Sequence, residues 1–177
     1  MARILRQSRF DIYKGKAAAQ FKLIPYDDNR IRDGKQRPGG FVLLEMAPFK
    51  EKIDDIKYYD WEKKTSFALS KPEEIGKIII APSLNEPLEI FHKSGDKIKK
   101  LIISKAPDGK NLFFNLNTQT DSGWINYSIT VSREEFTALK ELLNTASLET
   151  IGWGSTYSLI VSIDERLARL EEKLLND

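Results

Sequence analysis

Apolar and polar side chains alternate with a period of two along most of this 177-residue chain. The alternation is clearest over residues 111–120 and 124–131, and it is typical of strands that have one buried face. Turn-forming sequences such as Asp108-Gly109 and Asp121-Ser122-Gly123 separate the strands. Links of this length join antiparallel neighbours, because parallel neighbours need long crossover connections. The chain therefore predicts antiparallel sheets.

The expected strands fall into two groups of four, and each group is followed by a helix. The strands are expected to cover residues 8–14, 16–25, 38–48, 58–69, 87–92, 98–105, 111–120 and 124–131. The helices are expected at about 71–80 and 133–148, where apolar residues recur with helical spacing. Each is preceded by a candidate capping box, Ser70/Glu73 and Ser132/Glu135. The predicted fold class is α+β, with two four-stranded antiparallel sheets and two helices.

A third helix is predicted near the C-terminal end of the chain, where Ser162 and Glu165 form another candidate capping box. Its apolar residues follow the spacing of a heptad seam: Ile160, Ile163, Leu167, Leu170 and Leu174. Two heptads are marginally stable alone in water, so this helix needs a partner. Docking on its own domain and packing across subunits are both open. The predicted domains are residues 1–153 and a helical extension over residues 154–177.

The composition excludes several classes of protein. Without cysteine, the chain can form neither a disulfide framework nor a thiolate–zinc site. No apolar run approaches the ~20 residues of a bilayer-spanning helix, so we expect a soluble protein without a membrane partner. The net charge is only +2, but it is +6 over residues 1–40, 0 over 41–132 and −4 over 133–177. A basic half favours contact with a polyanion.

The sequence contains no familiar enzyme motif. His92 is the only histidine, and the GxSxG, HExxH and GxxxxGK motifs are absent. The acidic pairs Asp27/Asp28 and Asp54/Asp55 lie in polar, loop-like stretches and are expected to be solvated. The sequence therefore predicts a binding protein with no catalytic residue, no cofactor, no metal site and no small-molecule substrate.

Aromatic and amide side chains lie on the strand faces that point away from the expected core. The candidates are Phe41, Phe113, Asn115, Asn117, Trp124 and Asn126. Unpaired bases stack on aromatic rings at about 1 to 3 kcal/mol each, and amides can bond base edges or phosphates. Packing between subunits is the alternative explanation, because exposed aromatic patches mark interfaces of either kind.

Lysines accompany these side chains, and cations can follow a phosphate backbone. The candidate cations are Lys14, Lys16, Lys63, Lys64, Lys99 and Lys100, and Trp61 lies just before two of them. Lys99 and Lys100 are adjacent on one expected strand, so they point to opposite faces and only one is expected to reach a given ligand. The mixture predicts a surface for single-stranded DNA or RNA.

Two of these stretches resemble the signature segments of the Whirly proteins, single-stranded DNA binders known from plant organelles. Residues 14–19 are similar to the family's KGKAAL, with Ala19 in place of leucine, and residues 59–70 are similar to its YDWEKKQxFALS. The similarity extends from Phe10 to Trp153 and stops there. It implies a fold of two four-stranded antiparallel sheets with two helices, arranged like blades.

The resemblance also implies a function. We expect a sequence-tolerant single-stranded DNA-binding protein that acts as a cyclic tetramer and protects exposed strands in replication, repair or recombination, with transcription regulation as a further role. In the family the KGKAA segment supports both DNA binding and association of tetramers, and Ala19 removes apolar contact area from the second role. RNA binding by the same surface and an assembly scaffold without nucleic-acid binding are the alternatives.

The position of the first strand bears on location. Because that strand is expected from residue 8, no room is expected for an organelle-targeting leader. The sequence therefore predicts a bacterial or phage cytoplasm, with an organelle as the alternative if residues 1–9 are a trimmed remnant.

Overall fold

The computed structural model describes residues 9–24, 31–32, 35–36 and 41–150. The chain forms two antiparallel sheets, in the order that the alternating pattern predicted. The strands of the first sheet are β1 (Arg9–Tyr13), β2 (Ala17–Ile24), β5 (Phe41–Ile53), β6 (Ile56–Tyr59) and β7 (Thr65–Leu69). Those of the second sheet are β8 (Leu88–Ser94), β9 (Lys97–Lys105), β10 (Leu112–Thr120) and β11 (Gly123–Val131). The two-residue strands β3 (Ile31–Arg32) and β4 (Lys35–Gln36) pair with each other.

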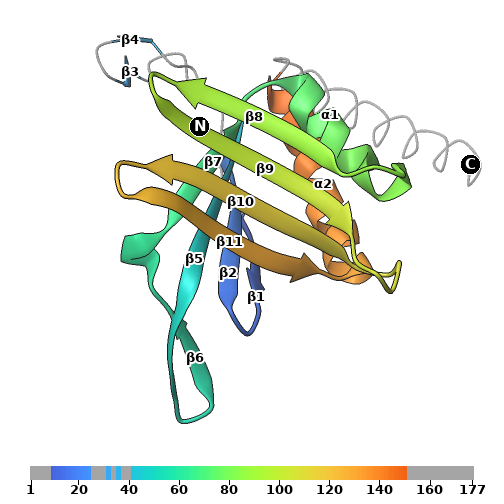
Figure 1. Cartoon of the computed structure of the whole chain (residues 1–177). Coiled ribbons are helices and arrows are strands. Elements are labelled where there is room, and N and C mark those ends of the chain that lie inside the picture. The colour runs from blue at the N-terminus through green and yellow to red at the C-terminus, as the bar shows by residue number, and fades with distance from the viewer. Residues whose placement is uncertain (1–8, 25–30, 33–34, 37–40, 151–177) are drawn as a thin grey trace, which may run out of the picture.

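The second sheet is a simple meander, whereas the first is branched. The order β11-β10-β9-β8 follows the chain, so each neighbour is joined by a hairpin. In the first sheet the order is β1-β2-β5-β6, and β7 pairs with the earlier part of β5 on the edge opposite β2. Figure 1 shows the second sheet crossing in front of the first at a steep angle.

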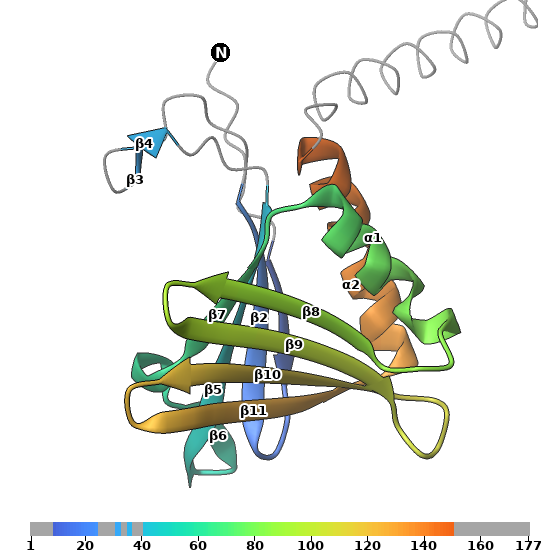
Figure 2. The same ribbon diagram turned by 45° about the horizontal axis from the view of Figure 1, so that its top comes forward.

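The core lies between the two sheets and is closed at one end by the helices. Phe21 and Phe114 meet edge to face across it, with ring centroids 5.9 Å apart, and such a pair contributes about 0.5–1.5 kcal/mol beyond area burial. The helices α1 (Pro72–Ile80) and α2 (Arg133–Thr150) lie side by side at that end (Figure 2). Among the described residues, neither helix combines the length and hydrophobicity that a membrane-spanning helix needs.

The two helix starts differ from each other. At α2 the expected capping box is confirmed: Ser132 Oγ accepts a hydrogen bond from the Glu135 N–H, and the Ser132 N–H donates to Glu135 Oε2. The Ser70 cap is wrong. Because Pro72 occupies the first helical position and forces Lys71 into an extended conformation, Lys71 is the N-cap residue and makes no side-chain cap bond.

The strand expected over residues 58–69 is also wrong, since it is interrupted. The Asp60 side chain accepts hydrogen bonds from the N–H groups of Glu62 and Lys63, and this cap starts a 3-10 turn, η1 (Trp61–Lys63). The preceding part pairs instead with an extended β5, and the resulting hairpin projects from the body (Figure 1). Asp54 and Asp55 form its turn with φ of 47° and 65°, the left-handed geometry that a tight hairpin requires.

The expected helix over residues 154–177, with its Ser162/Glu165 box, lies outside the described residues, as do Asp27 and Asp28.

Candidate nucleic-acid interface

The outer face of the second sheet, defined as the face that points away from the core, carries six of the predicted site residues. Strand register places Phe91, Lys100, Asn117 and Asn126 in one row across all four strands. The neighbouring row contains Asn115 and Ser128, and Phe113 and Thr130 pair beyond it. Trp124 pairs with Gln119 on the other side. The structure thus brings together Phe113, Asn115, Asn117, Trp124 and Asn126 with Lys100.

Two rings on this face are open to solvent. The exposed fraction is 58% for Trp124 and 55% for Phe91, and Phe113 is partly exposed. Phe91 was not among the predicted site residues. The same alternation could have found it, because Ile90 points into the core and the next side chain must point outward. Open rings on the two edge strands, with amides between them, match what an unpaired strand requires: faces for stacking and donors or acceptors that tolerate any base.

Lys99 and Lys100 point to opposite faces, as expected, and only Lys100 reaches the outer face. Lys100 Nζ lies 2.8 Å from Glu89 Oε2 on the neighbouring strand. Lys99 Nζ donates to the Ser66 carbonyl at 2.7 Å and so ties the second sheet to β7. Lys99 therefore does not lie on the outer face, because its position in the strand directs it toward the other sheet.

The 3-10 turn η1 places Trp61 and Lys63 beside the edge of the second sheet. The Tyr127 hydroxyl donates to the Lys63 carbonyl at 2.8 Å, which fixes the turn against β11. Lys63 Nζ is 3.2 Å from Asp60 Oδ2. Hydrogen bonding from the Lys63 side chain, above all, lowers the pKa of Asp60. Trp61 is half-buried and Lys63 exposed, and the turn contacts the core-facing side of β11, because Tyr127 pairs with the buried Leu116.

The outer face of the first sheet holds a carboxylate between two lysines. Glu45 is only 4% exposed, and its oxygens lie 2.5 Å from Lys22 Nζ and 2.7 Å from Lys64 Nζ. Burial alone would raise the pKa of Glu45, but hydrogen bonds from both lysines, together with their charges, outweigh it and lower the pKa. Phe41 lies on the same face at the start of β5 and is half-buried. Lys22 and Glu45 were not predicted, since nothing in the sequence pairs them.

Lys14 and Lys16 lie in the turn between β1 and β2 rather than on a strand. Lys14 Nζ is 2.7 Å from Glu135 Oε1, which ties this turn to the start of α2, whereas Lys16 is exposed. Ala18 and Ala19 are fully buried by their own chain. Ala19 therefore takes its apolar contact from the core of its own subunit rather than from a surface for association.

The side chain of His92 packs between elements of the fold. Its Nε2 lies 2.9 Å from Glu74 Oε1, and its ring stacks on Phe67 with centroids 4.2 Å apart. The histidine thus joins α1, β7 and β8. No group of three or more metal-ligating side chains is found in the part of the chain that the structure describes.

Comparisons with known proteins agree with this architecture. The family model described as "Whirly transcription factor" matches residues 12–142. The curated protein "Single-stranded DNA-binding protein WHY2, mitochondrial" of Arabidopsis thaliana is 29% identical over 156 residues. That alignment covers 81% of this chain and 63% of the relative, so the chain spans less than two thirds of the relative's length.

Solved structures give the same result. The crystal structure of WHY1 from Arabidopsis thaliana has a TM-score of 0.72 at 30% identity, and the match covers 89% of this chain and 93% of that one. The plant transcriptional regulator PBF-2 has a TM-score of 0.68 at 30% identity, covering 88% of each chain. These matches confirm the predicted fold class.

The expected location in a bacterial or phage cytoplasm is wrong by the same comparison. The curated relative is a mitochondrial plant protein, which points to an organelle.

The assignment of this chain to a family rests on three findings that agree. They are the sequence motifs, the two crossed sheets and a family model that matches most of the chain. This protein belongs to the Whirly family.

Proposed function

We propose that this protein binds single-stranded DNA on the outer face of its second sheet with little choice of base sequence. The observation that carries the proposal is the pair of exposed rings, Phe91 and Trp124, set around Lys100, Asn117 and Asn126. A face directed only at water would not carry two large open rings without a partner. Bases can stack on such rings whatever their identity, because every base has an aromatic face.

The relatives support the proposal by what they are called. One is named as a single-stranded DNA-binding protein and another as a transcriptional regulator. We extend the proposal to a cyclic tetramer that protects exposed strands in replication, repair or recombination, with transcription regulation as a further role. Light scattering of the free protein measures the assembly, and a mass other than four chains would contradict that part.

The binding test compares ligands by fluorescence anisotropy. Oligo-dT should bind more tightly than a duplex of the same length, and the affinity should fall as salt rises from about 50 to 200 mM. Equal affinity for the duplex would contradict the proposal. Equal affinity for oligo-rU would extend it to RNA, because stacking does not read the 2′-hydroxyl. Failure to bind any oligonucleotide would favour an assembly scaffold.

The residues are tested by removing one ring at a time. Trp124→Ala and Phe91→Ala should each weaken oligo-dT binding by about 5- to 150-fold, the equivalent of about 1 to 3 kcal/mol of stacking. Tyr58→Ala is the matched control, since Tyr58 is an exposed aromatic residue on the projecting β5–β6 hairpin. An equal loss in all three variants would show that the second sheet has no special role.

A further inference from the structure

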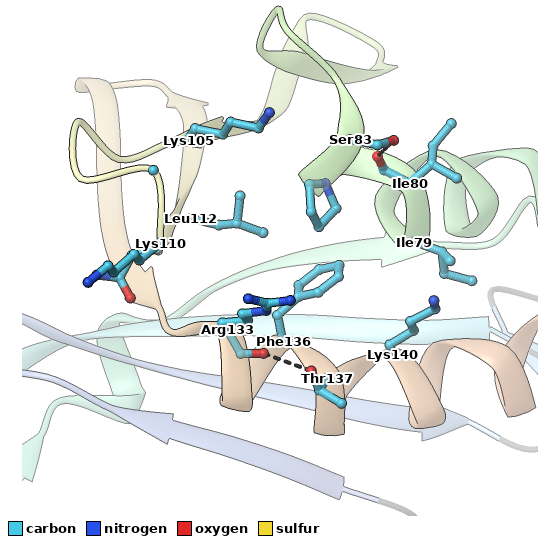
Figure 3. Close-up of a pocket in the computed structure, with 13 residues that line it drawn as sticks. Ile79, Ile80, Ser83, Lys105, Lys110, Leu112, Arg133, Phe136, Thr137 and Lys140 are labelled. Atoms are coloured by element: carbon cyan, nitrogen blue, oxygen red, sulfur yellow. Dashed lines mark hydrogen bonds between the residues drawn. The ribbon is translucent and has the colours of Figure 1, made fainter.

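A hollow of about 600 Å³ lies at the end of the second sheet, between the helices and the β9–β10 loop. We call it the basic groove. Three segments form it: the end of α1 with the following turn, the loop from Lys105 to Leu112, and the first turns of α2. Figure 3 shows Lys105 and Lys110 on the loop side, Lys140 on the helix side, and Arg133 with Phe136 between them.

The groove concentrates positive charge that no carboxylate of the described residues neutralises. Its cations are Lys105, Lys110, Arg133 and Lys140, and no Asp or Glu in the described part of the chain lines it. None of the four forms an ion pair with a residue that the structure describes. All four are exposed. Like charges gathered without a counter-ion favour an anionic ligand.

Four acids lie next to lining residues in the sequence, and none of them lines the groove: Asp108, Glu134, Glu135 and Glu141. Asp108 accepts hydrogen bonds from the backbone N–H groups of Lys110 and Asn111, at 2.9 and 3.1 Å. Glu134 lies beside Arg133 in the first turn of α2, where hydrogen bonds at the helix start, more than the arginine, lower its pKa.

Three of the lysines predicted from the sequence behave differently. Lys14 pairs with Glu135, Lys64 with Glu45, and Lys100 with Glu89. Each of these cations already has a carboxylate within 3 Å. Phosphate binding there must compete with an existing ion pair, whereas in the basic groove it would not. The groove thus gathers four cations that no described carboxylate pairs, whereas Lys100, beside the open rings, is paired.

The groove lies around the end of the second sheet from its outer face. Ser104 and Phe113 are paired neighbours on that face, and the adjacent lining residues Lys105 and Leu112 pair with each other and point to the opposite face. A strand that passes Phe113 must therefore turn around the end of the sheet to reach the groove. The floor is apolar, with Ile79, Pro82, Leu112 and Phe136, and its size lies in the usual range for ligand sites. A nucleotide combines a flat apolar base with an anionic phosphate, and the groove offers a surface for each.

We propose that the basic groove binds the phosphodiester backbone of a single strand whose bases stack on the outer face of the second sheet. Lys105, Lys110, Arg133 and Lys140 hold the phosphates, and Phe91 and Trp124 hold the bases. This inference rests on the proposed function. It assigns the sequence-independent, salt-sensitive part of binding to a site that the aromatic residues do not reach.

Lysine footprinting tests the proposal directly. The full-length protein is treated with an amine-reactive ester, with and without oligo-dT, and modification is measured by mass spectrometry. Oligo-dT should protect Lys105, Lys110 and Lys140, while the hairpin residues Lys50 and Lys57 remain unprotected. Protection of Lys100 alone would contradict the assignment of the phosphates to the basic groove and would leave the proposed function intact. Low modification of the three groove lysines in the free protein would also overturn it, because the groove would then be closed by assembly.

A variant with the three groove lysines changed to glutamine gives a second readout. Each phosphate contact that is lost should reduce the slope of log affinity against log salt by about 0.7, so the slope should fall by about 2. The control changes Lys50, Lys52 and Lys57 to glutamine and removes the same charge from the hairpin. Equal slope changes in both variants would overturn the proposal. If the wild-type protein bound no oligonucleotide, the proposed function itself would fail.

Discussion

At the scale of single residues, Glu45 decides where two lysines of the first sheet point. Its carboxylate is buried on the outer face and receives hydrogen bonds from Lys22 and Lys64, one on β2 and one just before β7. Hydrogen bonds to charged groups contribute about 1.5–3 kcal/mol, more than neutral ones, because the carboxylate is partly removed from water. Without the Glu45 carboxylate, Lys22 and Lys64 would both lose their ion-pair partner.

We therefore predict that Glu45→Gln lowers the free energy of unfolding by about 1 to 3 kcal/mol at pH 7. The pKa of Glu45 in the folded state lies below its ordinary value of 4.5, so the stabilisation is complete above that value. It is lost as the pH falls through the folded-state pKa. Urea denaturation across acidic pH should show the two proteins converging.

Glu73→Gln is the control for this series, because Glu73 is exposed on α1. Its effect should stay within about 0.5 kcal/mol at every pH. A gap between wild type and Glu45→Gln that widens in acid would contradict the assignment.

At the scale of elements, the two helices begin by different means. The start of α2 depends on reciprocal hydrogen bonds between Ser132 and Glu135. Glu135 also forms an ion pair with Lys14 in the β1–β2 turn. The start of α1 depends on Pro72, which presets the backbone and lacks the N–H that a cap would serve. The capping box thus connects the last helix to the first hairpin.

Ser132→Ala should lower the free energy of unfolding by about 1 kcal/mol, the usual value of a lost N-cap. Ser70→Ala is the matched control, and its effect should stay within about 0.5 kcal/mol because Ser70 does not cap α1. Thermal or urea denaturation of both variants checks the difference. Equal losses would show that the serines act by some means other than capping.

The elements that could be predicted from the sequence are those fixed by local pattern. The bounds of β10 and β11 differ by no more than one residue from the prediction, because alternation is a property of neighbouring residues. The break at Asp60 could not be predicted, since a single side chain accepting two N–H groups competes with an otherwise good strand pattern. The same competition between local bonds and periodicity explains the projecting hairpin.

The candidate site also contains residues that local pattern predicts and contacts that it does not. Trp124 and Phe113 could be placed on the outer face by alternation, and Phe91 could have been found by the same rule. The ion pairs could not, because Lys14 and Glu135 are 121 positions apart in the chain. The basic groove could not be predicted either, since it forms only where three separate segments meet.

At the scale of the whole molecule, the open rings and the cations of the basic groove occupy different regions. The outer face of the second sheet supplies open rings and amides, and the basic groove supplies cations around the end of the sheet that lies toward the helices. This arrangement predicts that bases and phosphates of one strand contact different regions. Mutations of rings and of groove lysines should therefore act on different properties, affinity at fixed salt in the first case and the salt slope in the second.

The central claim is that unpaired bases lie against the outer face of the second sheet. Photocrosslinking with oligo-dT that carries 5-iododeoxyuridine tests it most directly, because this base forms covalent bonds with aromatic side chains that it stacks on. Mass spectrometry of the crosslinked peptides should locate the bonds at Trp124 and Phe91. Crosslinks confined to Phe49 or Tyr58 on the hairpin, with none on the second sheet, would contradict the account.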